Sequence, residues 1–138
     1  MAEAIARRRF AEREWTHVDV ASAGVAAGPG SPASSHAIIV SADRGLDLTA
    51  HRSQPLSPEL VEWADLILAM SASHLRGVAA MGGGDKAALL TDFHDGDEAG
   101  LPIEDPFGGD EESYRAAFEQ IERAIDALAR RLEPILAP

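Results

Sequence analysis

The sequence lacks cysteine and has few basic residues. Because cysteine is absent from all 138 residues, disulfide bonds, thiolate metal sites and cysteine nucleophiles are excluded within them. Lys and Arg number 12 against 23 Asp and Glu, which gives a net charge of −11. A surface this acidic repels phosphate backbones, so neither nucleic acid nor an anionic membrane is expected as the main partner. A small, locally positive anion site remains compatible with this charge.

Long apolar runs are also missing. No run approaches the ~20 residues that span a bilayer, and residues 1–9 lack the apolar segment of a signal peptide. We therefore expect a cytoplasmic protein. A chain of 138 residues fits one compact domain around a single core.

The residue spacing gives no reason to expect a metal or a cofactor. Asp92, His94, Asp95 and Asp97 crowd one loop, but their spacing fits neither an EF-hand nor a helical histidine pair. We interpret this segment as a solvated acidic loop. The glycine run before Asp85-Lys86 lacks the Gly-Lys-Ser/Thr ending of a nucleotide-binding loop, so it is interpreted as a helix end and a turn.

Segments with helical spacing alternate with short apolar runs. The helices that we expect cover residues 2–14, 34–43, 57–64 and 71–81, with a last one from about residue 110. Ser57-Pro58 marks a helix start, and Gly45 marks a helix end. Short strands are expected at residues 18–20, 65–70 and 87–90. This alternation indicates an α/β domain in which helices cover both faces of a parallel sheet.

The last helix has the clearest pattern. Its apolar stripe consists of Tyr114, Phe118, Ile121, Ile125, Leu128 and Leu132. Acidic residues lie at its start and basic residues near its end, as the helix dipole favours. Pro134 is expected to close it. We interpret the stripe as a surface that packs on the core.

The segment Ile103–Gly109 is the best candidate for catalytic chemistry. Asp105 precedes Pro106, and proline disfavours the helical conformation for the residue before it. Asp105 is therefore expected to project from a loop near the rim of the sheet, followed by the apolar Phe107 and a flexible glycine pair. This arrangement suits a general acid. A plain surface turn is the alternative, because Asp-Pro is common in turns.

Five short motifs occur in a specific order. They are Met1-Ala2-Glu3-Ala4, Ser22-Ala23-Gly24-Val25, His51-Arg52-Ser53 with Leu56, Ala64–Met70, and Asp105-Pro106-Phe107-Gly108-Gly109. In this order the sequence resembles the low-molecular-weight protein-tyrosine phosphatase family over essentially its whole length. The Phe-Gly-Gly ending is most similar to the bacterial branch that includes protein arginine phosphatases.

The resemblance implies a single-domain, three-layer sandwich with a four-stranded parallel sheet. In the family, a central first strand and a phosphate-binding loop precede the residues that resemble Met1-Ala2-Glu3-Ala4. That loop carries a cysteine nucleophile and an arginine five residues later. We therefore expect residues 1–138 to be an N-terminally truncated phosphatase domain without its first strand, inactive as given, and a misplaced start in the gene model is the simplest explanation.

The resemblance also assigns roles to residues that are present. Asp105 would protonate the leaving atom and then activate water. Phe107 would line the substrate entrance. His51 and Ser22 would support the phosphate-binding loop through hydrogen bonds, although an ordinary loop histidine and an ordinary strand-end serine remain equally good interpretations.

The implied activity is hydrolysis of phosphotyrosine or phosphoarginine in a phosphorylated protein partner through a cysteinyl-phosphate intermediate. The sequence leaves open which of the two is the substrate. A different class of function is also open, namely a non-catalytic binding module on the same fold. An in-frame upstream segment that encodes a strand and a Cys-x5-Arg loop would exclude that alternative.

Overall fold

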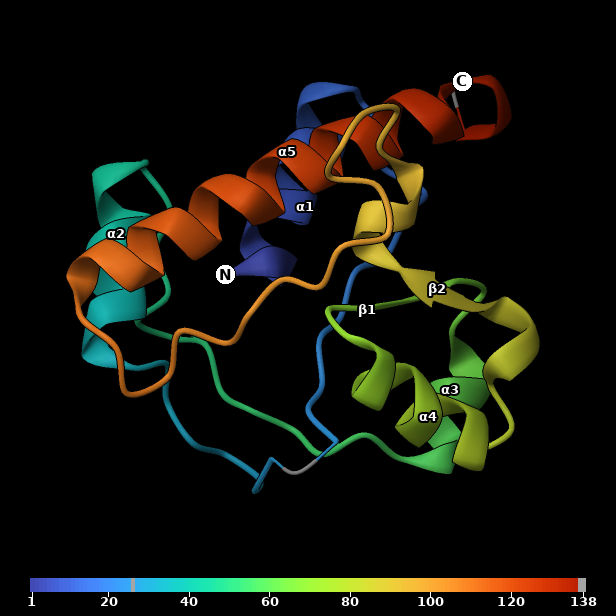
Figure 1. Cartoon of the computed structure of the whole chain (residues 1–138), viewed down its shortest axis with the longest axis horizontal. Coiled ribbons are helices and arrows are strands. Elements are labelled where there is room, and N and C mark those ends of the chain that lie inside the picture. Colours follow the sequence, from blue (N-terminus) through green and yellow to red (C-terminus); the bar gives the residue numbers. More distant parts are fainter. Residues whose placement is uncertain (26, 137–138) are drawn as a thin grey trace.

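The computed structural model describes residues 1–25 and 27–136, and it contains the expected alternation of helices and strands (Figure 1). The elements in chain order are α1 (Ala2–Glu12), α2 (Ser35–Asp43), α3 (Pro58–Trp63), β1 (Ile67–Ala69), α4 (Ala72–Ala80), the 3-10 helix η1 (Gly84–Lys86), β2 (Ala87–Leu89), the 3-10 helix η2 (Leu90–Phe93) and α5 (Glu111–Leu136). The α/β class predicted from the sequence is therefore confirmed.

Strands β1 and β2 form a parallel pair in which Ile67 lies opposite Ala87 and Ala69 opposite Leu89. Within residues 1–25 and 27–136 this pair is the whole sheet, so two of the three strands expected in the chain, at residues 65–70 and 87–90, are seen there as shorter strands. The prediction of a strand at residues 18–20 is wrong. No ladder forms along this segment, and the Val20 carbonyl accepts a hydrogen bond of 2.6 Å from the Arg7 guanidinium instead.

Helices cover both faces of the strand pair. Successive side chains of a strand point to opposite sides, so neighbouring residues of β1 contact different layers. Leu68 packs against the main core, which is built largely from α1, α2 and α5. Ile67 points the other way, toward α3 and α4. There its side chain, with those of Val61 and Val78, surrounds the place that a Cβ on Gly83 would occupy. Figure 1 shows the same order, with α3 and α4 on one side of the strands and α5 on the other.

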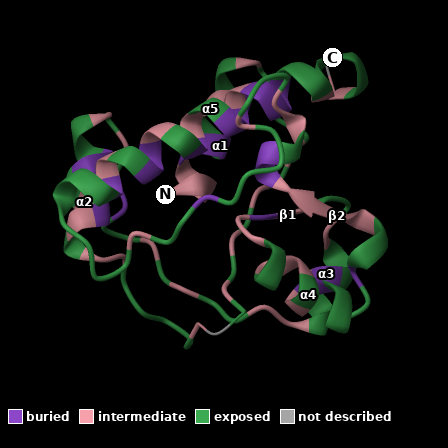
Figure 2. Ribbon diagram, in the orientation of Figure 1, coloured by how far each residue is buried: buried purple, intermediate pink, exposed green. Residues whose placement is uncertain are grey.

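The main core follows the apolar stripe of α5, as predicted. Tyr114, Phe118, Ile121, Ile125 and Leu128 are all buried. They pack with buried residues of α1 and α2 in one cluster, and Figure 2 shows this buried seam along the three helices.

Arginine–carboxylate pairs reinforce the contact between these helices. The Glu122 carboxylate on α5 accepts from Arg9 of α1 at 2.8 Å and from Arg44, just after α2, at 3.4 Å. Arg9 also donates to Asp126 at 2.7 Å, and the Arg44 guanidinium lies over the Phe118 ring. Glu122 thus connects three helices.

Helix ends mostly follow the sequence signals. The Ser57 hydroxyl accepts from the Leu60 amide at 3.1 Å, and Gly45 takes a positive φ of 78° directly after the C-cap of α2. The prediction for Pro134 is wrong, because α5 continues through it to Leu136. Proline removes one backbone donor, but Leu132 and Leu136 on either side pack against the core. Among the described residues, no helix combines the length and apolar composition needed to cross a bilayer.

Candidate active site

Two helices begin at the carboxyl edge of the strand pair. Helix α4 starts directly after β1, and the amino end of α1 lies beyond the end of β1 (Figure 1). Met1 shares one hydrophobic cluster with Met70, at the end of β1, and with Ile103. Neither N-cap residue, Met1 or Ser71, caps its helix through a side chain. Because the first-turn N–H groups and the helix dipole favour an anion, this edge is suited to a phosphoryl group.

Ser22 contacts the first turn of α1. Its hydroxyl donates to the Glu3 carboxylate at 2.9 Å, and its carbonyl accepts from the Gln54 side chain at 2.9 Å. Glu3 also lies 3.5 Å from the Arg7 guanidinium. Burial lowers the pKa of the neighbouring Met1 α-amino group, while Glu3 acts against this shift. The predicted support residue Ser22 is therefore held beside the amino end of α1.

His51 lies on the segment that runs beside Ser22. The amide of Gly24 donates to the carbonyl of Gln54 at 3.1 Å, and the amide of Leu56 donates back to Gly24 at 2.9 Å. The His51 side chain is half-buried, and its imidazole forms no hydrogen bond within the described part of the chain. The fold brings the Ser22 and His51 segments together without joining the two side chains, so a supporting role for either remains a prediction.

Asp105 stands on an exposed loop that is anchored to the strand pair. The amide of Ile103 donates to the carbonyl of Met70 at 2.9 Å, which fixes the start of the loop at the end of β1. The Asp105 carboxylate accepts from the Phe107 amide at 3.0 Å, and the Phe107 side chain is 81% exposed. The predicted loop near the sheet rim is thus observed, with both side chains facing solvent.

Asp110 fixes the far end of this loop. The sequence indicates only its negative charge at the start of the helix and does not predict this anchoring role. The Asp110 carboxylate accepts from both the amide and the hydroxyl of Ser113 at 2.9 Å, and these bonds lower the pKa of Asp110. His36 on α2 contacts the Tyr114 ring edge-on at 5.5 Å. The Asp-x-x-Ser spacing was the available signal. For the contact of Gln54 the sequence gives no signal, because its partner Ser22 is distant in sequence.

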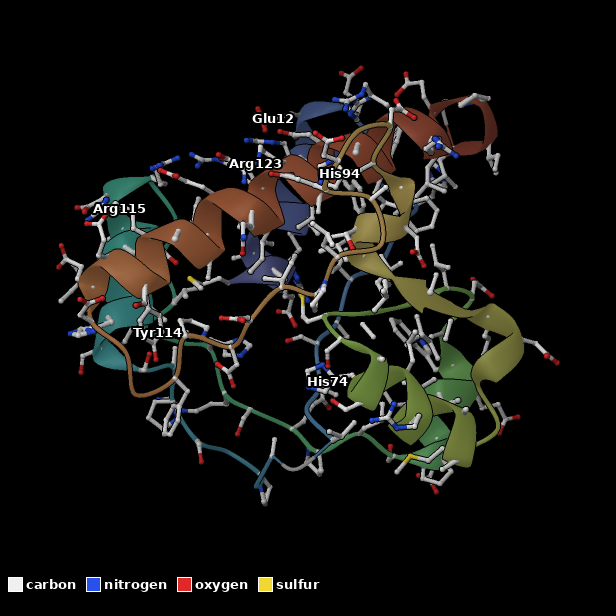
Figure 3. The ribbon with its side chains drawn as sticks, viewed as in Figure 1. Glu12, His74, His94, Tyr114, Arg115 and Arg123 are labelled. Atoms are coloured by element: carbon white, nitrogen blue, oxygen red, sulfur yellow. The ribbon has the colours of Figure 1, made fainter. Side chains whose placement is uncertain are left out.

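The acidic loop after η2 uses its side chains for internal contacts. The Glu98 carboxylate receives three contacts of 2.8–3.2 Å from Arg123 and lies 3.2 Å from His94, which Figure 3 shows close to α5. Asp95 pairs with Arg131 at 3.1 Å. Among residues 1–25 and 27–136, no cluster of three or more His, Asp or Glu is arranged to hold a metal ion.

The fold and this edge define a class: a small α/β protein with helix amino ends and a carboxylate loop gathered at the carboxyl edge of a parallel strand pair. Residues 1–135 match the family described as low molecular weight phosphotyrosine protein phosphatase. The chain therefore belongs to this family, which confirms the resemblance seen in the sequence.

The relatives include two bacterial protein-arginine-phosphatases. That of Geobacillus stearothermophilus is 42% identical over 118 residues, covering 84% of this chain and 78% of the relative. That of Bacillus subtilis is 37% identical over 135 residues, covering 96% and 87%. The solved YwlE arginine phosphatase from Geobacillus stearothermophilus superimposes with a TM-score of 0.85 at 38% identity, covering 96% of this chain and 83% of that chain. A YwlE mutant with a phosphorylated active-site serine in place of cysteine gives 0.86 at 37% identity, covering 97% and 87%.

Proposed function

We propose that this chain forms the body of a protein phosphatase that hydrolyses phosphoarginine or phosphotyrosine in phosphorylated proteins. The observation that carries the proposal is the placement of Asp105, whose loop is anchored at the end of β1 by the bond between Ile103 and Met70. The amino ends of α1 and α4 lie toward the same edge of the strand pair (Figure 1). A proton donor and an anion-favouring region at one edge support phosphoryl transfer.

The proposed chemistry has two steps. In the first, a cysteine thiolate attacks phosphorus, and Asp105 protonates the oxygen or nitrogen of the leaving side chain as its bond to phosphorus breaks. In the second, Asp105 removes a proton from water, which attacks the cysteinyl phosphate and releases inorganic phosphate and the thiolate. Phe107 lines the substrate entrance in this proposal, and Ser22 and His51 support the loop that binds phosphate.

The thiolate that this chemistry needs is not among residues 1–138, which contain no cysteine. We therefore propose that the 138-residue chain is inactive by itself and that a Cys-x5-Arg segment joined before Met1 makes it active. The test is turnover of an aryl phosphate and of a phosphoarginine peptide by both chains. Turnover by the longer chain alone supports the proposal, and no turnover by a folded longer chain contradicts it.

Substitution of Asp105 tests the assigned acid. In the active chain, Asp105→Asn should lower kcat on the phosphorylated peptide on the order of 10²–10⁴-fold, because the leaving atom departs without a proton. An aryl phosphate with a very acidic leaving group should lose much less, since it needs little protonation. Equal losses on both substrates would contradict the role of Asp105 as general acid.

The names of the relatives make phosphoarginine the first substrate to test, because the two described above are protein-arginine-phosphatases. Others are probable tyrosine phosphatases, such as that of Ralstonia solanacearum at 32% identity over 135 residues, covering 98% of this chain and 88% of the relative. Comparing kcat/KM for phosphoarginine and phosphotyrosine in one peptide sequence decides between them.

A non-catalytic binding module is the second candidate, and the absence of cysteine supports it. It requires that the 138-residue chain bind a phosphorylated protein without hydrolysing it. Retention of a phosphopeptide by this chain at a measurable Kd, without phosphate release, would favour the module. Absence of binding, together with turnover by the longer chain, would favour the enzyme.

A further inference from the structure

The loop between η2 and the Asp105 segment carries the pair Asp95-Gly96. Of the aspartates in the sequence, only Asp95 is followed by glycine, and asparagine is absent. The backbone nitrogen of the next residue can attack an aspartyl carboxyl, and glycine has no side chain to hinder that attack. Asparagine undergoes the same ring closure more readily. Asp95 is therefore the position of this chain at which the reaction is expected first.

The structure leaves both reacting groups accessible. Asp95 and Gly96 are exposed, and the Asp95 side chain retains 78% of its exposure. Within the described residues, the Gly96 amide donates to no backbone carbonyl outside the helices and strands. A Cβ on Gly96 would meet nothing within 4 Å, so the space around the pair is open. Neither burial nor a hydrogen-bonded amide protects this peptide bond.

One contact opposes the reaction. The Asp95 carboxylate lies 3.1 Å from the guanidinium of Arg131 on α5. This ion pair holds the carboxylate toward α5 and has to open before the carboxyl carbon can approach the Gly96 nitrogen. Both partners are more than half exposed, so solvent screens the pair and it slows ring closure by at most about fivefold.

We propose that Asp95 is a site of spontaneous covalent modification at which isoaspartate forms. The Gly96 nitrogen bonds to Cγ of Asp95, and the carboxyl hydroxyl leaves with the amide proton as water, which closes a succinimide. Water then reopens the ring. Attack at Cγ breaks its bond to nitrogen and restores aspartate. Attack at the former backbone carbonyl breaks the other bond to nitrogen and gives isoaspartate, so the product has the mass of the parent.

Isomerisation changes the loop without changing its charge. The main chain now runs through Cβ and Cγ of Asp95 and is one carbon longer, while the free carboxylate stands on Cα. The carboxylate that pairs with Arg131 is thereby moved to a different atom of the chain. The longer segment also enters the turn from which Glu98 contacts Arg123 at 2.8 Å. An exposed isoaspartate is a substrate for methyltransferases that esterify its carboxylate with S-adenosylmethionine. This chemistry is independent of the proposed phosphatase activity.

The test follows the 138-residue chain during weeks at neutral pH. Digestion and mass spectrometry with fragmentation specific for isoaspartate locate the site, and methylation by an isoaspartyl methyltransferase counts it. We expect isoaspartate at Asp95 and none at Asp97, which is exposed in the same loop but precedes Glu98. Gly96→Ala should slow its formation severalfold. Because Gly96 does not adopt a positive φ and has open space around it, this variant should keep the parent fold and Tm.

Two arginine variants test the opposing ion pair. Arg131→Gln should speed isoaspartate formation by up to about fivefold. Arg130→Gln removes the same charge from the neighbouring exposed position, which forms no ion pair in the described part of the chain, and should leave the rate unchanged. Absence of isoaspartate at position 95 in the parent, or equal rates in the parent and Gly96→Ala, would overturn the proposed site. Equal rates in the two arginine variants would overturn the opposing role of the ion pair.

Discussion

At the scale of single residues, Glu14 is the strained position of the chain. Among the described residues it alone combines a side chain with a positive φ, which is 61°. It ends the turn after α1. A side chain in the left-handed region is disfavoured by contact between Cβ and the backbone. We expect Glu14→Gly to stabilise the fold by up to about 1 kcal/mol.

Urea unfolding of the two proteins measures this difference. The matched control is Ala11→Gly, which places glycine at an exposed position within α1 and should destabilise by about 1 kcal/mol. If Glu14→Gly destabilised the chain as much as the control, the strain assigned to Glu14 would be refuted.

Individual residues were predictable where the signal is local. Ser57, Gly45 and the loop position of Asp105 follow from one to three neighbouring residues, and all three were found as predicted. Gln54 and Ser53 were not predictable as contacts. Their hydrogen bonds run to residues more than twenty positions away, and no spacing rule encodes such pairs.

At the scale of elements, the Asp110 carboxylate caps the start of α5 through its bonds from Ser113. Its hydrogen bonds from Ser113 hold the pKa of Asp110 below its ordinary value of 3.8. A depressed carboxyl pKa adds stability above the unfolded-state pKa, and this stability is lost as the pH falls through the folded-state value. We expect Asp110→Ala to lower Tm at pH 7 and the difference from the parent to shrink as the pH falls below 3.8.

Thermal unfolding followed by circular dichroism at pH 7, 5 and 3 tests this expectation. Glu112→Ala serves as the control, because this exposed neighbour forms no hydrogen bond or ion pair within the described chain. A Tm difference for Asp110→Ala that stayed constant from pH 7 to pH 3 would show that the cap does not depend on ionisation.

Whole elements were predicted well where one side chain pattern repeats over several turns, as in α5. The prediction of a strand at residues 18–20 is wrong because the alternation of Val18 and Val20 indicates a strand only if a neighbouring strand is available. Within the described residues none pairs with them. The prediction that α5 ends at Pro134 is wrong because the packing of Leu132 and Leu136 outweighs one missing backbone hydrogen bond.

At the scale of the whole molecule, the layer of α3 and α4 fits closely against β1. A Cβ atom on Gly83 would lie 2.8 Å from side-chain carbons of both Val61 and Val78 and 3.2 Å from Ile67. We expect Gly83→Ala to destabilise the fold by roughly 1–3 kcal/mol, because both valines are buried and have little room to move.

Gly84→Ala is the matched control. A Cβ there would lie 3.6 Å from Ala79, an ordinary contact, so chemical denaturation should give nearly the parent stability. Equal stabilities of the two variants would show that the layer yields more easily than its geometry indicates. The sequence predicted two helical layers, but not this contact, because helix spacing does not specify how close two layers lie.

The shared carboxylate of Glu122 has an evolutionary consequence. Arg9 in α1 and Arg44 at the end of α2 are far apart in the chain, yet both donate to this one side chain. Loss of either arginine changes what the other contributes, so their substitutions should be epistatic. A lineage that replaces Glu122 would remove one partner from two cations at once, while Arg9 keeps Asp126 and Arg44 keeps Glu119.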